Sequence, residues 1–223
     1  MRNAMIMTGL ITLAALFTGC GDSNPVGYVM DSDNEPVTTQ SRQVGEFDSI
    51  AARGMGQLVI EQTGTESLTI TASEAVLPML ECRVVDGQLH LGPRQEVTLP
   101  RGTRIVYHLT VKDLRALQTA GAIDIEATGI DTDEISITLA GAGRVSLAGT
   151  VERQLVSIAG AGSYDGESLD SSTAQISIAG AGSAVVCVRD HLDVRLAGAG
   201  MVEYIGDPEL ELNVGRTGTV RRR

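Results

Sequence analysis

Apolar and polar residues alternate in short segments across the second half of the chain. The alternation is strict in five of them, at residues 137–139, 156–158, 176–178, 194–196 and 212–214. A period of two places successive side chains on opposite faces of an extended strand. Each segment is therefore predicted to be a β-strand with one buried face and one solvated face.

A glycine motif follows these segments almost without change. The sequence "AGAG" begins at Ala140, Ala159, Ala179 and Ala197, which are 19, 20 and 18 residues apart. "TAGAID" around Ala120 and "NVGRTGTV" from residue 213 are degraded copies, and a further alternating segment follows each motif. The repeating unit is thus a strand, a glycine corner, a second strand and a polar turn.

One such unit cannot bury its own apolar face, whereas stacked units share one continuous core. Stacking brings equivalent positions to within about 4.8 Å, so a corner repeated in every coil needs the smallest residues. We therefore predict an all-β protein built as a right-handed parallel β-solenoid. Its structural corner glycines are expected at Gly121, Gly141, Gly143, Gly160, Gly162, Gly180, Gly182, Gly198 and Gly200.

Other all-β architectures fit the repeat less well. A left-handed helix of hexapeptides needs a strict six-residue period, and a β-propeller needs units of about 40 residues. An antiparallel β-sandwich remains the main alternative, because hairpins also produce alternating strands.

The first half of the chain also predicts strands, but with less regularity. The stretch from Ala52 contains an earlier Gly-x-Gly corner, and "DGQ" at residues 86–88 is typical of a tight hairpin turn. Residues 73–80 favour a helical turn with Ser73 as its N-cap. No linker interrupts the pattern, so residues 45–223 are predicted to form a single domain.

The first residues are predicted to be an export signal. Arg2 precedes an uncharged apolar run at residues 5–17, which is short for a membrane span but suits a signal peptide. The run closes on Gly19 and Cys20, as in a bacterial lipobox, so residues 1–19 are assigned to the signal and Cys20 to lipidation. This predicts an exported protein that is lipid-anchored in the envelope, in the outer membrane of a Gram-negative cell. Residues 20–44 are polar and predict a flexible tether, with a strand docked on the domain as the alternative.

Composition narrows the candidate partners. The net charge of −11 argues against binding nucleic acid, and only 3% of residues are aromatic. The remaining cysteines, Cys82 and Cys187, are expected at different ends of an elongated stack, which favours two separate thiols over a disulfide.

No catalytic or metal-binding constellation emerges from the sequence. His90, His108 and His191 lie at no metal-like spacing, and there is no nucleophile elbow around a serine. The acidic residues at 131–134 lack the glycine signature of calcium-binding β-rolls and are interpreted as a solvated turn. We therefore predict a protein that is not an enzyme and has no cofactor.

Several segments, in order, resemble the head GIN domain family, also described as auto-transporter adhesins. They are "FDSIAARGMGQLVIEQ", "VVDGQLHLG", "LTVKDLRALQTAGAIDIEA", the repeated Gly-Ala-Gly corners and "VEYIGDPEL", and they cover residues 47–220. The resemblance implies a β-solenoid-like fold, a bacterial envelope or secreted protein and a role in adhesion. It brings no catalytic residues.

The favoured function is therefore a non-enzymatic, lipid-anchored module that presents a solenoid surface to a glycan or protein ligand. A structural envelope protein that assembles with itself as a homo-oligomer is the first alternative. An enzyme that acts on polysaccharide is the second, and it is disfavoured because few aromatic rings are present to stack on sugars.

Overall fold

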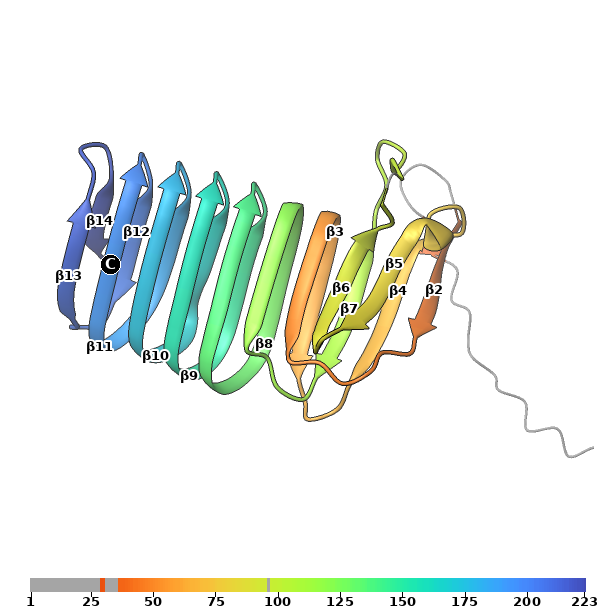
Figure 1. The fold of residues 1–223 in the computed structure, drawn as a ribbon, viewed down its shortest axis with the longest axis horizontal. Coiled ribbons are helices and arrows are strands. Elements are labelled where there is room, and N and C mark those ends of the chain that lie inside the picture. Colours follow the sequence, from red (N-terminus) through yellow and green to blue (C-terminus); the bar gives the residue numbers. More distant parts are fainter. Residues whose placement is uncertain (1–28, 31–35, 96) are drawn as a thin grey trace, which may run out of the picture.

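The computed structural model describes residues 29–30, 36–95 and 97–223, and these form an all-β protein. Its body consists of strands that bend and continue into the next coil (Figure 1). They are β8 (Ala116–Gly141), β9 (Arg144–Gly160), β10 (Ser163–Gly180) and β11 (Ser183–Gly198). Each pairs in parallel with the next, giving a solenoid of about five turns. The predicted parallel β-solenoid is confirmed.

The apolar positions form columns inside the stack. Leu139 lies opposite Ile158, Ile158 opposite Ile178, and Ile178 opposite Leu196. All four side chains are at most 4% exposed. A parallel column, two residues earlier in each strand, is buried as well. Every coil thus covers the apolar edge of its neighbour, as expected of a repeat that is stable only when stacked.

The N-terminal end of the stack is built differently. The corner strand β3 (Ser49–Gln62) pairs in parallel with β8. Beyond it lie β7 (Val106–Val111), β4 (Ser67–Ser73), β2 (Pro36–Arg42) and β1 (Val29–Met30), and every pairing after β7 is antiparallel. The hairpin of β5 (Leu80–Val85) and β6 (Gln88–Pro93) joins the first part of β3. Antiparallel strands therefore close this end (Figure 1).

The last coil continues the stack in shorter pieces. β12 (Met201–Ile205) pairs with the first part of β11, and β13 (Glu209–Val214) pairs with its second part. β14 (Thr219–Arg222) then pairs with β12. All of these pairings are parallel, so the solenoid pattern extends to the C-terminal end of the described chain.

Two local predictions have different outcomes. The hairpin turn is confirmed: Asp86 and Gly87 have φ values of 49° and 76°, as a type I′ turn requires. The N-cap prediction for Ser73 is wrong. The turn is a short 3-10 helix at Leu77–Met79, its cap residue is Val76, and no side chain caps it. Ser73 instead accepts a backbone hydrogen bond from Val76 N at 2.9 Å.

Part of the stretch predicted as a tether is ordered. Pro36–Arg42 forms β2, which pairs residue by residue with β4, so the docked-strand alternative describes these residues. The predicted signal peptide at 1–19, Cys20 and most of the remaining tether lie outside the described residues. Within the described ranges, no helix is long and apolar enough to cross a bilayer.

The two domain cysteines are free thiols on separate strands. Cys82 lies in β5 near the N-terminal end, and Cys187 lies in β11, several coils away. Burial raises the pKa of both thiols, and for Cys82 the nearby Arg42 partly offsets this rise. Neither cysteine therefore has the lowered pKa that marks a reactive thiol.

Candidate functional site

The predicted corner glycines form two rows along one edge of the stack. In the first row, Gly141 is in register with Gly160, Gly160 with Gly180, and Gly180 with Gly198. Gly121 extends this row and is itself in register with Gly54 of β3. The second row consists of Gly143, Gly162, Gly182 and Gly200, which are buried beneath the corner.

The two rows need glycine for different reasons. Gly160 has φ of +122°, and a Cβ there would lie 2.6 Å from the carbonyl oxygen of Gly141 in the preceding coil. Gly162 has no such φ, and its Cβ would lie 3.1 Å from the carbonyl oxygen of Gly143. The first row thus requires both an unusual backbone conformation and close approach, whereas the second requires only close approach.

Backbone hydrogen bonds join successive corners. Ala161 N donates to Gly141 O at 3.0 Å, and Ser163 N donates to Gly143 O at 3.0 Å. The bonds recur at neighbouring corners with similar lengths. The corner therefore has a fixed geometry, and the strand after it leaves each coil at the same place.

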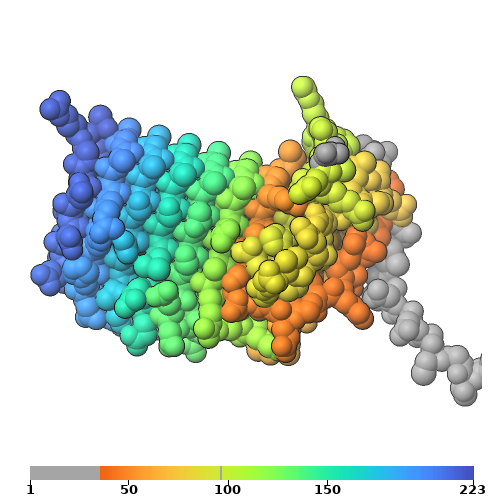
Figure 2. All heavy atoms as spheres, viewed as in Figure 1, coloured from red at the N-terminus to blue at the C-terminus, as the bar shows by residue number. Residues whose placement is uncertain are grey.

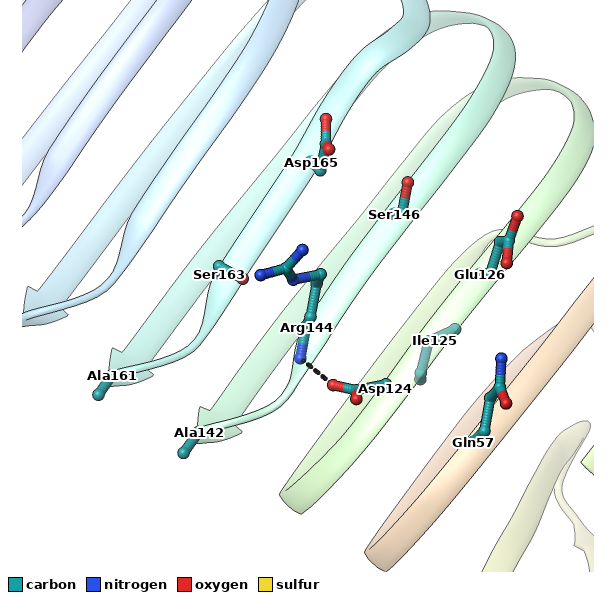
Figure 3. Close-up of a pocket in the computed structure, with 10 residues that line it drawn as sticks. All are labelled: Gln57, Asp124, Ile125, Glu126, Ala142, Arg144, Ser146, Ala161, Ser163 and Asp165. Atoms are coloured by element: carbon teal, nitrogen blue, oxygen red, sulfur yellow. Dashed lines mark hydrogen bonds between the residues drawn. The ribbon is translucent and has the colours of Figure 1, made fainter. Parts of the chain in front are cut away.

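Outward side chains of the strands after the corner form ordered columns. Gln57 lies opposite Asp124 on the next strand, and Arg144 lies opposite Ser163 one coil further on. Two residues along, Glu126, Ser146 and Asp165 form a second column. We call the outward surface made by these seven residues the post-corner face; they stand on neighbouring parallel strands in Figure 3.

The post-corner face is hollowed and acidic. The hollow has a volume of about 620 Å³, and Ala142 and Ala161 of the corners border it (Figure 3). It is lined by the carboxylates of Asp124, Glu126 and Asp165 and by the guanidinium of Arg144. Three negative groups against one positive group leave a local excess of negative charge.

Two of these charged groups have no side-chain partner among the described residues. Asp124 is engaged, because its Oδ1 accepts a hydrogen bond from Arg144 N at 3.1 Å, and Asp165 Oδ1 accepts one from Glu167 N at 3.2 Å. The Glu126 carboxylate and the Arg144 guanidinium make no side-chain hydrogen bond or ion pair with the described part of the chain. Both are exposed to solvent. They are available to an external ligand.

Under this face lies a buried polar chain that was not predicted. Tyr164 Oη donates to Gln154 Oε1 at 2.9 Å, Gln154 Nε2 donates to Ser171 Oγ at 2.7 Å, and Ser171 Oγ donates to Cys187 O at 2.8 Å. Gln154 and Ser171 are 0% exposed. Burial raises the pKa of Tyr164, which keeps its hydroxyl protonated as a donor. The signal was present in the sequence: Gln154 occupies an inward position of the alternation that includes Val156.

The remaining candidate groups are dispersed. His90, His108 and His191 lie on β6, β7 and β11. The described residues contain no group of three or more His, Cys, Asp or Glu placed to hold a metal ion. In the acidic stretch at 131–134, Gln62 contacts the backbone of Asp131, and Glu134 pairs with Arg153 of the next coil at 3.2 Å. Glu134 therefore makes a side-chain contact between coils, whereas Asp131 is contacted through its backbone.

Aromatic rings contribute little to the described surface. Phe47, Tyr107 and Tyr164 are at most 5% exposed, and only Tyr204 is partly exposed. In the view of Figure 2, the coils appear as parallel ridges across a rather even surface. A sugar-binding platform of stacked rings is not formed by these residues.

The fold of this chain is similar to that of a solved structure. A solved structure described as a putative adhesin from Bacteroides fragilis NCTC 9343 matches with a TM-score of 0.66 at 20% identity, over 84% of this chain and 97% of that one. Two further structures match at 18% identity, each over 84% of this chain and 96% of the other. One is described as a putative adhesin from Parabacteroides merdae ATCC 43184, with a TM-score of 0.48. The other is described as a putative lipid binding protein from Parabacteroides distasonis ATCC 8503, with a TM-score of 0.47. At 20% identity, the similarity to the Bacteroides fragilis structure concerns the fold alone.

No curated protein matches the chain. The family model described as "Putative auto-transporter adhesin, head GIN domain" matches residues 46–208, which include β3 to β12 and all nine predicted corner glycines. The description places such proteins among exported or envelope-associated adhesins. This chain belongs to the head GIN domain family.

Proposed function

We propose that this protein is a non-enzymatic adhesin, anchored to the bacterial envelope through a lipid on Cys20, whose post-corner face binds an extended, basic polypeptide segment. The observation that carries the proposal is the pair of exposed charged groups, Glu126 and Arg144, that no other described side chain neutralises. Family membership supports adhesion as the general role.

The geometry of the face suits an extended ligand. Its columns repeat with the strand spacing of about 4.8 Å, so an extended ligand lying across the strands meets one outward polar side chain per coil in each column. The excess of carboxylates favours positive groups on the ligand. A polypeptide is preferred over a glycan because the described surface offers no ladder of rings on which sugars could stack.

Ligand binding by this face can be measured with lysine-rich synthetic peptides as probes. We expect the purified protein to bind them, and Glu126→Lys to weaken binding about tenfold, equivalent to about 1.4 kcal/mol. The same charge change at Glu152, an exposed carboxylate of β9 outside the face, is the matched control and should leave binding unchanged. Surface charge attraction also predicts weaker binding at higher salt.

Two results would contradict this assignment. One is equal loss of binding in the Glu126→Lys and Glu152→Lys variants, which would indicate a nonspecific charge effect. The other is selective binding on a glycan array, with no binding of the peptides, which would assign the face to a different ligand class.

Membrane attachment has a separate test. Lipid chains on Cys20 would hold the protein by burying acyl groups, at about 0.8 kcal/mol for each CH2. After cell fractionation we expect the unchanged protein in the membrane fraction and the Cys20→Ser variant in the soluble fraction. The control variant Cys187→Ser should stay with the membrane. A Cys20→Ser variant that sediments with membranes as before would refute the anchor.

A further inference from the structure

The apolar columns of the solenoid continue into the last coil, beyond which no described coil follows. Leu210, Leu212 and Val214 of β13 follow Leu192, Val194 and Leu196 of β11 in register. The three residues of β11 are 0–4% exposed, whereas those of β13 are 39%, 49% and 37% exposed. These side chains therefore occupy core positions that have a coil on one side, that of β11, and no described coil on the other.

The backbone of the last coil is also unpaired on one side. Among the described strands, β13 pairs only with β11, and β14 pairs only with β12. Each thus presents a free row of N–H and C=O groups, at the end of the stack seen beside the C label in Figure 1. Exposed apolar edges of this kind template pairing with another strand. The opposite end of the stack is built from antiparallel strands.

The two edges carry opposite charges on their outward faces. Glu209 and Glu211 of β13 make no ion pair with any described residue. Arg221 and Arg223 lie in and just after β14, and they contact Glu203 and Glu167. An arginine has five N–H donors, so each retains donors for a second carboxylate.

We propose that this C-terminal end is a docking surface for a second copy of the chain, with β13 of each copy against β14 of the other. A two-fold axis along the strand direction brings the ends together in this way and makes both new strand pairs antiparallel. It sets Glu209 and Glu211 opposite the partner's arginines, which is the attractive arrangement for cross-strand pairs. The other two-fold axis sets β13 against β13 and brings like charges together.

A second copy is the occupant that these features fit best. It supplies apolar columns with the same spacing as those of this solenoid. It also supplies two unpaired strand edges, β13 and β14, on opposite sides of those columns, with charges complementary to those of the edges they would meet. The joined pair would form one continuous stack with both N-terminal ends outward. Docking would remove Leu210, Leu212 and Val214 of both copies from water.

The test is the oligomeric state of the purified full chain carrying Cys20→Ser, measured by analytical ultracentrifugation over a range of concentrations. We expect a dimer, and we expect Leu212→Glu to raise its dissociation constant at least tenfold. Met55→Glu, at an apolar residue that is 43% exposed on β3, is the matched control and should leave the dimer unchanged. A wild-type monomer at all concentrations, or a dimer equally weakened by both variants, would overturn the proposal.

A second variant covers the case in which Leu212→Glu fails to fold. Glu209→Arg combined with Glu211→Arg changes only exposed charges, and it should dissociate the β13–β14 arrangement by opposing arginines to arginines. A dimer that is unchanged or tightened by this charge reversal would overturn the arrangement proposed. Backbone amides of 209–214 and 219–222 should also gain hydrogen-exchange protection as concentration rises, and unchanged protection would contradict docking at these edges.

Discussion

A Gly160→Ala variant is expected to lose about 4 kcal/mol of unfolding free energy, the largest effect of any substitution considered. Two costs combine at this corner. The backbone φ of +122° is strained for any residue with a Cβ, and that Cβ would lie 2.6 Å from the carbonyl oxygen of Gly141. The carbonyl cannot move away freely, because it accepts the hydrogen bond from Ala161 N.

Two other glycines separate these costs. Gly64 has φ of +80° with open space around its Cβ position, so Gly64→Ala should show only the backbone strain, about 1 kcal/mol. Gly45 has neither an unusual φ nor a neighbour within 4 Å, so Gly45→Ala should be neutral or slightly stabilising. Urea denaturation followed by circular dichroism gives all three values. If Gly160→Ala costs no more than Gly64→Ala, close approach between coils does not determine the corner.

The position of Gly160 in the stack adds a cooperative consequence. Each coil of a solenoid contacts only its neighbours, so stability is approximately a sum of coil and interface contributions. Gly160 of β9 faces Gly141 of β8, so a defect there weakens an interior junction and separates the coils on either side of it. We expect the unfolding transition of Gly160→Ala to become broader than that of the unchanged protein.

The solenoid was predictable because its determinants are local and repeated. Alternation identifies the strands, and the recurring "AGAG" identifies the bend and its period, so stacking in register is the simplest way to bury the column of Leu139, Ile158 and Ile178. Gly54 was visible as an earlier corner for the same reason. The division of the glycines into two rows was not predictable, because it depends on φ values and carbonyl positions that the sequence pattern does not encode.

The N-terminal end was less predictable because pairing partners there are not repeated. β4 and β7 alternate as the solenoid strands do, yet they pair antiparallel. Whether two strands pair parallel or antiparallel depends on the loops that connect them and on which strand covers the apolar face of β3. β2 has no buried residue, so its polar sequence resembled a tether although its backbone pairs with β4.

The candidate site was predictable only in part. The sequence indicated that variable residues follow each corner, but the juxtaposition of Glu126 and Arg144 depends on the register between coils of unequal length. The register shift between Ala127 and Ile130 absorbs such a difference. The buried polar chain could have been suspected from Gln154, whose inward position contradicts the apolar alternation. Its partners Tyr164 and Ser171 lie on the next coil and could not be identified without the structure.

That polar chain leads to the second large effect: Gln154→Leu should cost about 3 kcal/mol of unfolding free energy. Leucine matches glutamine in size but removes the acceptor for Tyr164 Oη, leaving a hydroxyl without a partner in the core. The Ser171 hydroxyl loses one partner but still donates to Cys187 O at 2.8 Å. Gln175→Leu, at an exposed glutamine on β10, is the matched control and should change stability by less than about 0.5 kcal/mol.

The double variant Gln154→Leu/Tyr164→Phe tests the mechanism more directly. Removing both partners of a buried hydrogen bond leaves no orphaned group at that bond, so the double variant should be more stable than Gln154→Leu alone by about 1–2 kcal/mol. Tyr164→Phe alone should be destabilising, because it leaves Gln154 Oε1 without a donor. Costs that simply add in the double variant would show that packing, and not hydrogen-bond satisfaction, makes Gln154 important. Recovery in the double variant would show that the chain from Tyr164 to Cys187 joins three coils through paired polar groups, each of which depends on the others.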